Sequence, residues 1–225
     1  MDYATFYLKK LYPLQDRVLN TIKRTAPAFY LTGGTALSRF YLQHRYSEDL
    51  DLFINDNEKF PDLTDGIIKE LQKEYQKTRI QLSDTDFVRI FVNENGVELK
   101  IEFINDVAYH FHSLKNEQSF QIDSWQNILS NKICALSRNA AKDYADILFL
   151  SLTYAFNWVD IYDAAKLKDT WVNEISSGQM IHDFDVQRLS EIRWMNEKTN
   201  INGFKHHFHV IAKDILMAAD NSLCK

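Results

Sequence analysis

The chain has 225 residues, 45% hydrophobic and 25% charged, which is enough to bury a core in one or two domains. Its six glycines and three prolines fall well below the usual shares of roughly 7% and 5%, which excludes collagen-like, low-complexity and turn-dense small-barrel classes. The sequence has no run of about eighteen apolar residues and no signal-peptide pattern. Two cysteines are too few for a metal cluster or a disulfide framework. We therefore expect a cytoplasmic protein that does not enter a membrane.

The net charge of −5 is unevenly distributed along the chain. Residues 1–45 contain seven basic and two acidic side chains, a balance of +5, which leaves −10 for the remainder. Solvated helix faces are the simpler explanation for the basic segment, and a surface that faces a polyanion such as RNA is the alternative.

The first half of the chain alternates between strand and helix patterns. Four segments have the β-branched and aromatic content of strands: residues 28–33, 49–54, 86–92 and 97–103. Thr35 is placed to cap a helix that runs to His44, and a second helix is expected over 62–76. Asn95-Gly96 supplies the positive φ angles of a tight hairpin.

Beyond residue 120, helical periodicity dominates. Helices are expected over residues 124–138, 140–154, 160–176, 186–197 and 213–220. We predict an α+β fold in which residues 1–115 form a mixed β-sheet with flanking helices. Residues 116–225 are expected to form a helical subdomain that completes a substrate-binding cleft beside this sheet.

Two acidic side chains share one face of the second predicted strand. Period-two alternation places Asp49 and Asp51 on the same side, opposite Leu50 and Leu52. Like charges this close disfavour joint ionisation, whereas Mg²⁺ prefers such oxygen ligands and commonly bridges one or two carboxylates and substrate phosphates. The simpler alternative is a solvent-facing strand with acids that bind nothing.

A third carboxylate is available on the last predicted strand of this half. Glu102 lies on its polar face and would join Asp49 and Asp51 if the two strands pair in register, with Glu98 as the competing candidate. Three clustered acids suit a two-metal site for in-line phosphoryl displacement.

A glycine turn offers the other half of such a site. Gly33-Gly34-Thr35 follows an apolar strand and opens a helix, so that backbone N–H groups could converge on a phosphate. The turn matches neither the Walker A pattern nor the GxGxxG fingerprint, which disfavours a P-loop NTPase and a Rossmann dehydrogenase. Its simpler interpretation is a sharp corner between strand and helix.

These elements stand in the order of a known motif: a strand, a glycine turn, a helix and an Asp-x-Asp strand. The matching segments are Leu31-Thr32-Gly33-Gly34-Thr35-Ala36-Leu37, Tyr41-Leu42, His44-Arg45, Ser47 and Asp49-Leu50-Asp51-Leu52-Phe53. They resemble the AbiEii/AbiGii toxin family of the nucleotidyltransferase superfamily, the toxin halves of type IV toxin-antitoxin and abortive-infection pairs.

A second element in the helical half resembles a later motif of that family. Lys132 interrupts an apolar helical stripe, and Lys142-Asp143-x-x-Asp146 follows it. The alternatives are a snorkelling Lys132 and an ordinary surface pair of Lys142 with Asp146. Asp143 lies on an apolar flank and would need a basic partner if it is buried. The resemblance implies that this element faces the nucleotide.

The resemblance implies a Mg²⁺-dependent nucleotidyltransferase, for which Mn²⁺ could substitute, that moves a nucleoside monophosphate from an NTP to an acceptor and releases pyrophosphate. RNA, such as the 3′ end of tRNA, would be the acceptor, and a DNA-binding antitoxin would be the partner. Asp49, Asp51 and Glu102 would hold the metal. The expected catalytic residues are Asp49, Asp51, Glu102, Lys132 and Asp143. The expected nucleotide-binding residues are Gly33, Gly34, Thr35, Arg45, Ser47, Lys132, Lys142 and Asp146.

Two other functions remain open from the sequence. One is a nucleotide-binding module that acts through a partner protein without turnover. The other is a nucleotidyltransferase for small molecules of the antibiotic-modifying type, because the acidic remainder of the chain would suit a cationic acceptor.

Glu102 departs from the Asp that many nucleotidyltransferases carry, and its longer side chain would shift the metal geometry.

Overall fold

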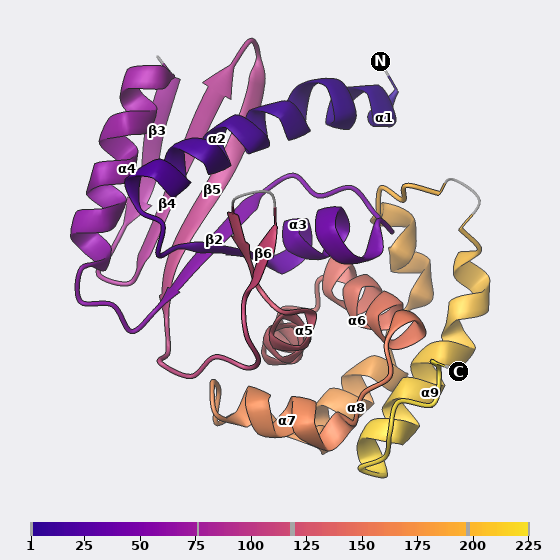
Figure 1. Ribbon diagram of the computed structural model, residues 1–225. Helices are drawn as coiled ribbons and strands as arrows, with labels where there is room; N and C mark the ends of the chain where they lie inside the picture. The colour runs from indigo at the N-terminus through magenta and orange to yellow at the C-terminus, as the bar shows by residue number, and fades with distance from the viewer. Residues whose placement is uncertain (1, 76, 118–119, 197–198, 225) are drawn as a thin grey trace. The chain divides into compact units, whose positions relative to one another are not determined.

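A computed structural model describes residues 2–75, 77–117, 120–196 and 199–224 (Figure 1). The chain groups into two compact units. The first comprises Met1–Ala36 and Tyr46–Asp123, and the second comprises Leu37–Arg45 and Ser124–Lys225. The first unit contains the β-sheet, whereas the second is helical.

The first unit is built on a mixed seven-stranded sheet with the order β3-β4-β5-β2-β1-β7-β6. Its strands are β1 (Tyr30–Thr32), β2 (Leu50–Asn55), β3 (Lys77–Ser83), β4 (Phe87–Glu94), β5 (Val97–Asp106), β6 (Lys115–Glu117) and β7 (Phe120–Ile122). β2 runs parallel to β5, and β1 runs parallel to β7; the other neighbours are antiparallel. The sheet and its flanking helices confirm the predicted fold class.

The four predicted strands are present as β1, β2, β4 and β5. Asn95 and Gly96 have φ angles of 52° and 79°, so the predicted hairpin between β4 and β5 is confirmed. The sequence did not predict β3, β6 or β7. β3 is exposed along most of its length and has only Thr78 and Ile80 as β-branched residues and no aromatic one, and β6 and β7 have three residues each, which is too short for a strand pattern.

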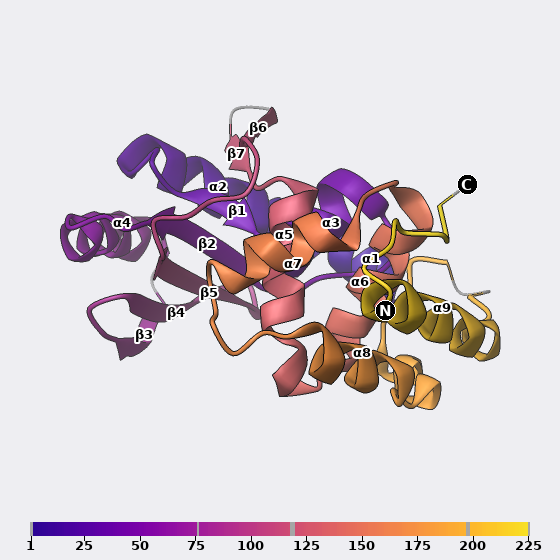
Figure 2. The same ribbon diagram turned by 90° about the horizontal axis from the view of Figure 1, so that it is seen from below.

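One face of the sheet carries the core of this unit. Leu50, Leu52 and Ile54 of β2 are buried, as the alternation predicted. Helices α2 (Tyr12–Thr25) and α4 (Phe60–Glu74) lie side by side over this face (Figures 1 and 2). The ring of Phe29 links α4 to the sheet, because it contacts Phe60 of α4 and Phe103 of β5.

Helices of the first unit differ from the predictions at their ends. An unpredicted N-terminal helical run consists of α1 (Tyr3–Phe6), the π-helix η1 (Tyr7–Leu11) and α2. α4 begins at Phe60, so that Pro61 occupies its first turn; the predicted last residue, Gln76, lies outside the described residues. The helix after the glycine turn, α3 (Gly33–Leu37), begins at Gly33 and continues as the π-helix η2 (Ser38–Leu42). The predicted N-cap role of Thr35 is therefore wrong, because Thr35 lies inside α3.

The second unit is a set of helices. It comprises η2, α5 (Trp125–Cys134), η3 (Leu136–Arg138), α6 (Ala141–Thr153), α7 (Trp158–Lys166), α8 (Glu174–His182), η4 (Val186–Glu191), η5 (Ile201–Gly203) and α9 (Phe204–Leu216). Among the described residues, no helix has the length and apolar character that crossing a bilayer requires.

Three of the predicted C-terminal helices need correction. The single helix expected over 160–176 is two helices, because Asn173 accepts a hydrogen bond from Ser176 N and starts α8. The helix expected over 186–197 is reduced to the short 3-10 segment η4, and Glu197 lies outside the described residues. α9 begins nine residues earlier than predicted and ends at Leu216, shortly before Ala218 adopts a positive φ of 50°.

Candidate functional site

The glycine turn packs directly against Asp51. Thr32, the last residue of β1, lies opposite Asp51 in the antiparallel register, and Gly33 follows with a φ of +66°. A Cβ atom on Gly33 would approach Asp51 Oδ2 to 2.3 Å. Since positive φ and close contact both favour glycine, the sequence places the turn and the carboxylate in one local structure of the first unit.

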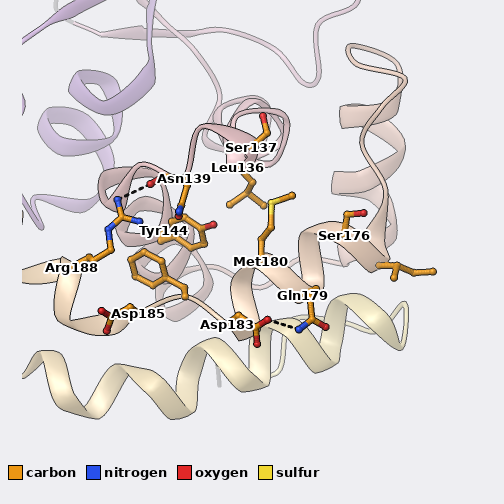
Figure 3. A pocket seen from close by; sticks show the side chains of 12 residues that line it. Leu136, Ser137, Asn139, Tyr144, Ser176, Gln179, Met180, Asp183, Asp185 and Arg188 are labelled. Carbon is orange, nitrogen blue, oxygen red and sulfur yellow. Dashed lines mark hydrogen bonds between the residues drawn. The ribbon is translucent and has the colours of Figure 1, made fainter.

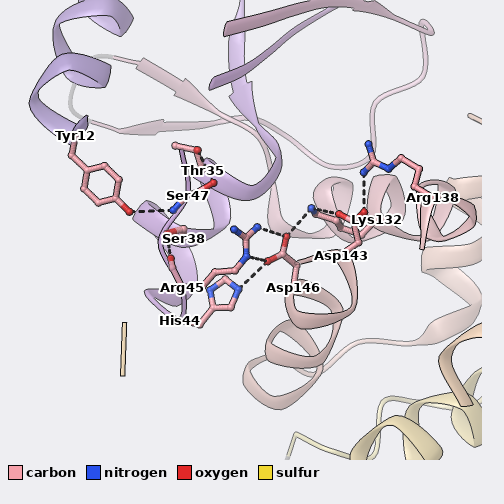
Figure 4. Close-up of polar contacts among 10 residues, drawn as sticks. All are labelled: Tyr12, Thr35, Ser38, His44, Arg45, Ser47, Lys132, Arg138, Asp143 and Asp146. Atoms are coloured by element: carbon pink, nitrogen blue, oxygen red, sulfur yellow. Dashed lines mark hydrogen bonds and ion pairs between the residues drawn. The ribbon is translucent and has the colours of Figure 1, made fainter. Parts of the chain in front are cut away.

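Two of the predicted nucleotide-binding hydroxyls are buried beside this turn (Figure 4). Thr35 Oγ1 lies 2.9 Å from Ser47 Oγ and donates to the carbonyl oxygen of Asp49. The Ser47 backbone N–H donates to the hydroxyl of Tyr12 at 3.4 Å. These bonds hold the segment that enters β2, so both hydroxyls fix the position of Asp49. Their contact with a nucleotide stays a prediction.

The strand register brings Glu102 beside Asp51. β2 and β5 are parallel neighbours in which Asp51 pairs with Glu102. Glu98 pairs instead with Asn93 on the far side of β5 and is exposed. Of the two candidates, Glu102 is therefore the neighbour of the Asp-x-Asp strand.

Lys100 lies between two of the predicted metal ligands. Its Nζ is 2.9 Å from Asp49 Oδ2 and 3.4 Å from Glu102 Oε1. Burial alone would lower the pKa of Lys100, but the hydrogen bond and charge of Asp49, with the charges of Glu102 and Asp51, raise it above its usual value. A positive charge is therefore favoured at this position.

Glu102 has a second basic partner. Arg89 Nε of β4 donates to Glu102 Oε1 at 2.6 Å. Burial would raise the pKa of Glu102, but Lys100 and Arg89 together lower it. Glu102 is thus held as a carboxylate, which makes it a weak general base.

The carboxylates fit a divalent cation in their chemistry. Within the described parts of the chain, no three carboxylate, imidazole or thiol groups already converge as ligands of one metal ion. Asp49 and Asp51 nevertheless offer the hard oxygen donors that Mg²⁺ prefers, and Lys100 shows that this group of acids stabilises a cation. Asp49 and Asp51 are the residues that would hold the metal, beside Glu102.

The second predicted motif forms a buried ion cluster within the helical unit (Figure 4). Lys132 of α5 lies between two aspartates of α6, with Nζ 2.6 Å from Asp143 Oδ1 and 2.7 Å from Asp146 Oδ2. Arg138 also donates to Asp143 Oδ2 at 3.0 Å. Asp143 is buried and has the basic partners that the sequence analysis required. The Lys132 side chain is 7% exposed, so the snorkelling alternative is wrong.

Asp146 is the centre of this cluster. The Arg45 guanidinium binds it through Nε at 2.7 Å and through its terminal nitrogen at 2.9 Å. His44 Nε2 lies 2.9 Å from Asp146 Oδ1. Burial would raise the pKa of Asp146, but the charges of Arg45 and Lys132 and the hydrogen bonds of His44 and Arg45 hold it well below the usual value. Asp146 is therefore ionised and accepts from four donor atoms.

Burial lowers the pKa of His44 despite the opposing hydrogen bond and charge of Asp146. His44 is therefore a neutral imidazole that donates from Nε2. Its Nδ1 is buried without a hydrogen-bond partner among the described residues.

The surface pair proposed for Lys142 and Asp146 is wrong. Asp146 points into the unit, whereas Lys142, one turn earlier on α6, is exposed and makes no ion pair among the described residues. Phosphate binding by Lys132, Arg45 and Lys142 stays a prediction, and of these three cations only Lys142 is exposed.

Sequence reasoning missed Lys100 and Arg89, which lie among the acids, and His44, which it quoted only as part of a motif. Lys100 alternates with Glu98 and Glu102 along β5, so its place on the polar face was readable from the sequence. Its contact with Asp49 depends on the pairing of β2 with β5.

A separate cavity of about 840 Å³ lies in the helical unit (Figure 3). The ring of Tyr144 stacks on Phe184 at 4.0 Å, and Arg188 reaches across to donate to the Asn139 carbonyl at 2.8 Å. None of the predicted site residues lines this cavity. Tyr144 belongs to α6, so the helix presents the cavity on one side and the aspartate cluster on another.

Two solved structures from Helicobacter pylori share the fold of the chain. JHP933 is 19% identical and covers 96% of this chain and 93% of its own, with a TM-score of 0.65. A candidate nucleotidyltransferase is 20% identical and covers 96% of each chain, with a TM-score of 0.63. At such identities the similarity establishes the fold alone. No curated protein matches the sequence.

The family follows from the sequence match. Residues 17–221 match the model of the nucleotidyl transferase AbiEii toxins of type IV toxin-antitoxin systems. Because the match spans most of the chain, the protein belongs to this family and is a nucleotidyltransferase.

Proposed function

We propose that the protein transfers a nucleoside monophosphate from an NTP to an RNA acceptor in a Mg²⁺-dependent reaction, as the toxin of a type IV toxin-antitoxin pair. The observation that carries the proposal is the contact between Gly33 and Asp51 beside a cation-binding group of acids. The turn offers backbone N–H groups to phosphate oxygens. Asp49 and Asp51 would hold Mg²⁺ next to them.

The reaction needs an acceptor hydroxyl that attacks the α-phosphorus of the NTP. A new P–O bond forms, the bond to the bridging oxygen of the β-phosphate breaks, and pyrophosphate leaves with that electron pair. When bound, Mg²⁺ would neutralise the charge that develops on the phosphoryl oxygens. The hydroxyl proton is released to solvent, directly or through a carboxylate of the site, and Glu102 is a weak base for this step because Lys100 and Arg89 lower its pKa.

Glu102 then has an electrostatic role in this proposal. It holds Lys100 and Arg89 close to the acids, so that two positive charges stand near the leaving pyrophosphate. The predicted role of Glu102 as a metal ligand requires that Lys100 give up its contact with Glu102.

The test is incubation of the purified protein with each labelled NTP, Mg²⁺ and total cellular RNA, followed by a denaturing gel. We expect label on RNA from at least one NTP and none after chelation of the metal. Label on RNA in the presence of chelator would contradict the metal requirement. Transfer to a small-molecule acceptor with no label on RNA would favour the antibiotic-type alternative, and NTP binding without any transfer would favour the binding module.

A further inference from the structure

One face of the sheet in the first unit carries aromatic and basic side chains in alternation. The even-numbered residues of Val88–Val92 on β4 are buried on the face that α2 and α4 cover. Phe87, Arg89 and Phe91 are half-buried on the opposite face. On the edge strand β3, Arg79 lies opposite Phe91 and is exposed.

Two arginines stack on these rings. The guanidinium carbon of Arg79 lies 4.5 Å from the ring centroid of Phe91, and that of Arg89 lies 5.2 Å from the centroid of Phe87. A planar guanidinium on an aromatic ring presents a flat, charged surface that can stack on a nucleic-acid base and pair with a phosphate. These two arginine–phenylalanine pairs lie side by side and form a platform about two strands wide.

Of the two arginines on the platform, Arg89 is paired with a carboxylate and Arg79 is not, within the part of the chain that the structure describes. Arg89 is bound to Glu102 and is 34% exposed. Arg79 makes no ion pair among the described residues, although it is exposed at the sheet edge. An exposed guanidinium without a carboxylate partner complements a phosphate group.

The platform is continuous with the candidate metal site. Asp51, Glu102 and Arg89 occupy one row across β2, β5 and β4. At the usual inter-strand spacing, β4 lies about 10 Å from β2. A chain of ion pairs from Arg89 through Glu102 and Lys100 to Asp49 connects the two ends of the row.

We propose that the sheet face formed by Phe87, Arg89 and Phe91 of β4 with Arg79 of β3 binds the single-stranded end of the RNA acceptor. Unpaired bases stack on the arginine and phenylalanine planes, and Arg79 binds the backbone. The platform rests on the proposed function, since it supplies the acceptor to the same sheet. Single strands are the fitting form, because the bases of a duplex are stacked on each other and do not expose their planes.

The test measures affinity for a labelled single-stranded RNA by fluorescence anisotropy, with Mg²⁺ present and NTP absent. Phe91→Leu removes the ring and keeps apolar volume, and we expect it to weaken binding at least about five-fold. Phe91→Tyr keeps the ring and should restore the affinity. Arg79→Gln should reduce the slope of log affinity against log salt by about 0.7, the value for one phosphate contact on a single strand.

Lys69→Gln is the matched control, because Lys69 is an exposed basic residue of α4, which covers the other face of the sheet. It should leave both affinity and salt slope unchanged. Arg79 is exposed, so its variant remains informative if Phe91→Leu fails to fold.

Unchanged affinity in Phe91→Leu and Arg79→Gln would overturn the proposal, as would equal competition by duplex RNA. If the β3 edge instead pairs with a strand of another protein, both variants should bind RNA as the wild type does. That result would count against the proposal. RNA binding that depends on Phe91 and Arg79, without label transfer, would reject the proposed function and keep the platform. Label transfer to RNA, together with an RNA affinity that neither variant changes, would support the proposed function and reject the platform.

Discussion

Each compact unit holds a lysine between two carboxylates, and the two lysines differ in burial. Lys100 in the sheet unit lies between Asp49 and Glu102 and is 28% exposed. Lys132 in the helical unit lies between Asp143 and Asp146 and is 7% exposed. Water can screen the charges around Lys100 and replace its ion pairs, whereas the charges around Lys132 are shielded from water.

The difference assigns the two groups different tasks. A partly exposed lysine can leave its carboxylates when a metal ion or a phosphate arrives, at the cost of a weak ion pair. A buried lysine cannot leave, because two ionised aspartates would then lie in the interior without compensation. We therefore expect the acids near Lys100 to take part in the reaction and the cluster around Lys132 to maintain the helical unit.

The largest expected effect concerns the reaction rate. Asp51→Asn removes a charge that the metal requires, so transfer should fall by about a hundred-fold or more. Asp51 is half-exposed, and its replacement should change the free energy of unfolding by less than about 1 kcal/mol. Labelled-nucleotide incorporation and urea unfolding measure the two quantities. Full activity in Asp51→Asn would show that the acids near Lys100 are not the metal site.

The next prediction compares the two lysines directly in stability. Lys132→Met leaves Asp143 and Asp146 buried with fewer positive charges and should cost about 3–5 kcal/mol of unfolding free energy. Lys100→Met removes a half-exposed partner and should cost less than about 1 kcal/mol. Urea denaturation of both variants provides the measurement. Similar losses in the two would remove the distinction between the units.

Two glycine variants separate the cost of a collision with Asp51 from the cost of a positive φ angle at a residue other than glycine. Gly96 in the β4–β5 hairpin also has a positive φ, but a Cβ there would have no neighbour within 4 Å. Gly96→Ala should therefore cost about 1 kcal/mol. Gly33→Ala adds the collision with Asp51 and should cost at least about 2 kcal/mol.

Nucleotide transfer gives a second readout of the same pair. It should be lost in Gly33→Ala and kept in Gly96→Ala, because only Gly33 lies against the candidate metal ligand. Equal unfolding free energies and equal activities in the two variants would show that Asp51 tolerates displacement.

The sequence predicted the elements whose pattern is local. β-branched and aromatic content identified β2, β4 and β5, and Asn95-Gly96 identified the hairpin between the last two, because each signal lies within a few consecutive residues. The exposed edge strand β3 has only two β-branched residues, Thr78 and Ile80, and no aromatic one, and it was missed.

Long-range partners explain what the sequence could not predict in the two charged groups. The contact of Lys100 with Asp49 depends on the register of β2 with β5, whose paired residues are about fifty positions apart. The partners of Asp146, His44 and Arg45, lie 102 and 101 residues away. Helical spacing placed Lys142 and Asp146 one turn apart, yet these distant partners draw Asp146 inward and leave Lys142 outside.

The smallest expected effect is the pH dependence of the helical unit. Burial lowers the pKa of His44 in the folded state, so the unfolded chain binds a proton on this side chain more readily. His44 therefore contributes stability that is complete above its unfolded pKa of about 6.5 and is lost as pH falls toward the folded pKa. The pKa of Asp146 is also lowered, so its contribution is lost only in the acid range below its usual value of 3.8.

His44→Gln isolates this effect, because the amide can still donate to Asp146 but does not titrate. Unfolding free energies of the wild type should decrease from about pH 7 to about pH 5, and the decrease should be smaller in His44→Gln. His207, whose pKa burial also lowers, accounts for part of the remaining slope, and His207→Gln in the same background measures that part. A slope unaffected by His44→Gln would mean that the pKa of His44 is the same in the folded and unfolded states, and a steeper decrease in His44→Gln would mean that the folded protein raises this pKa.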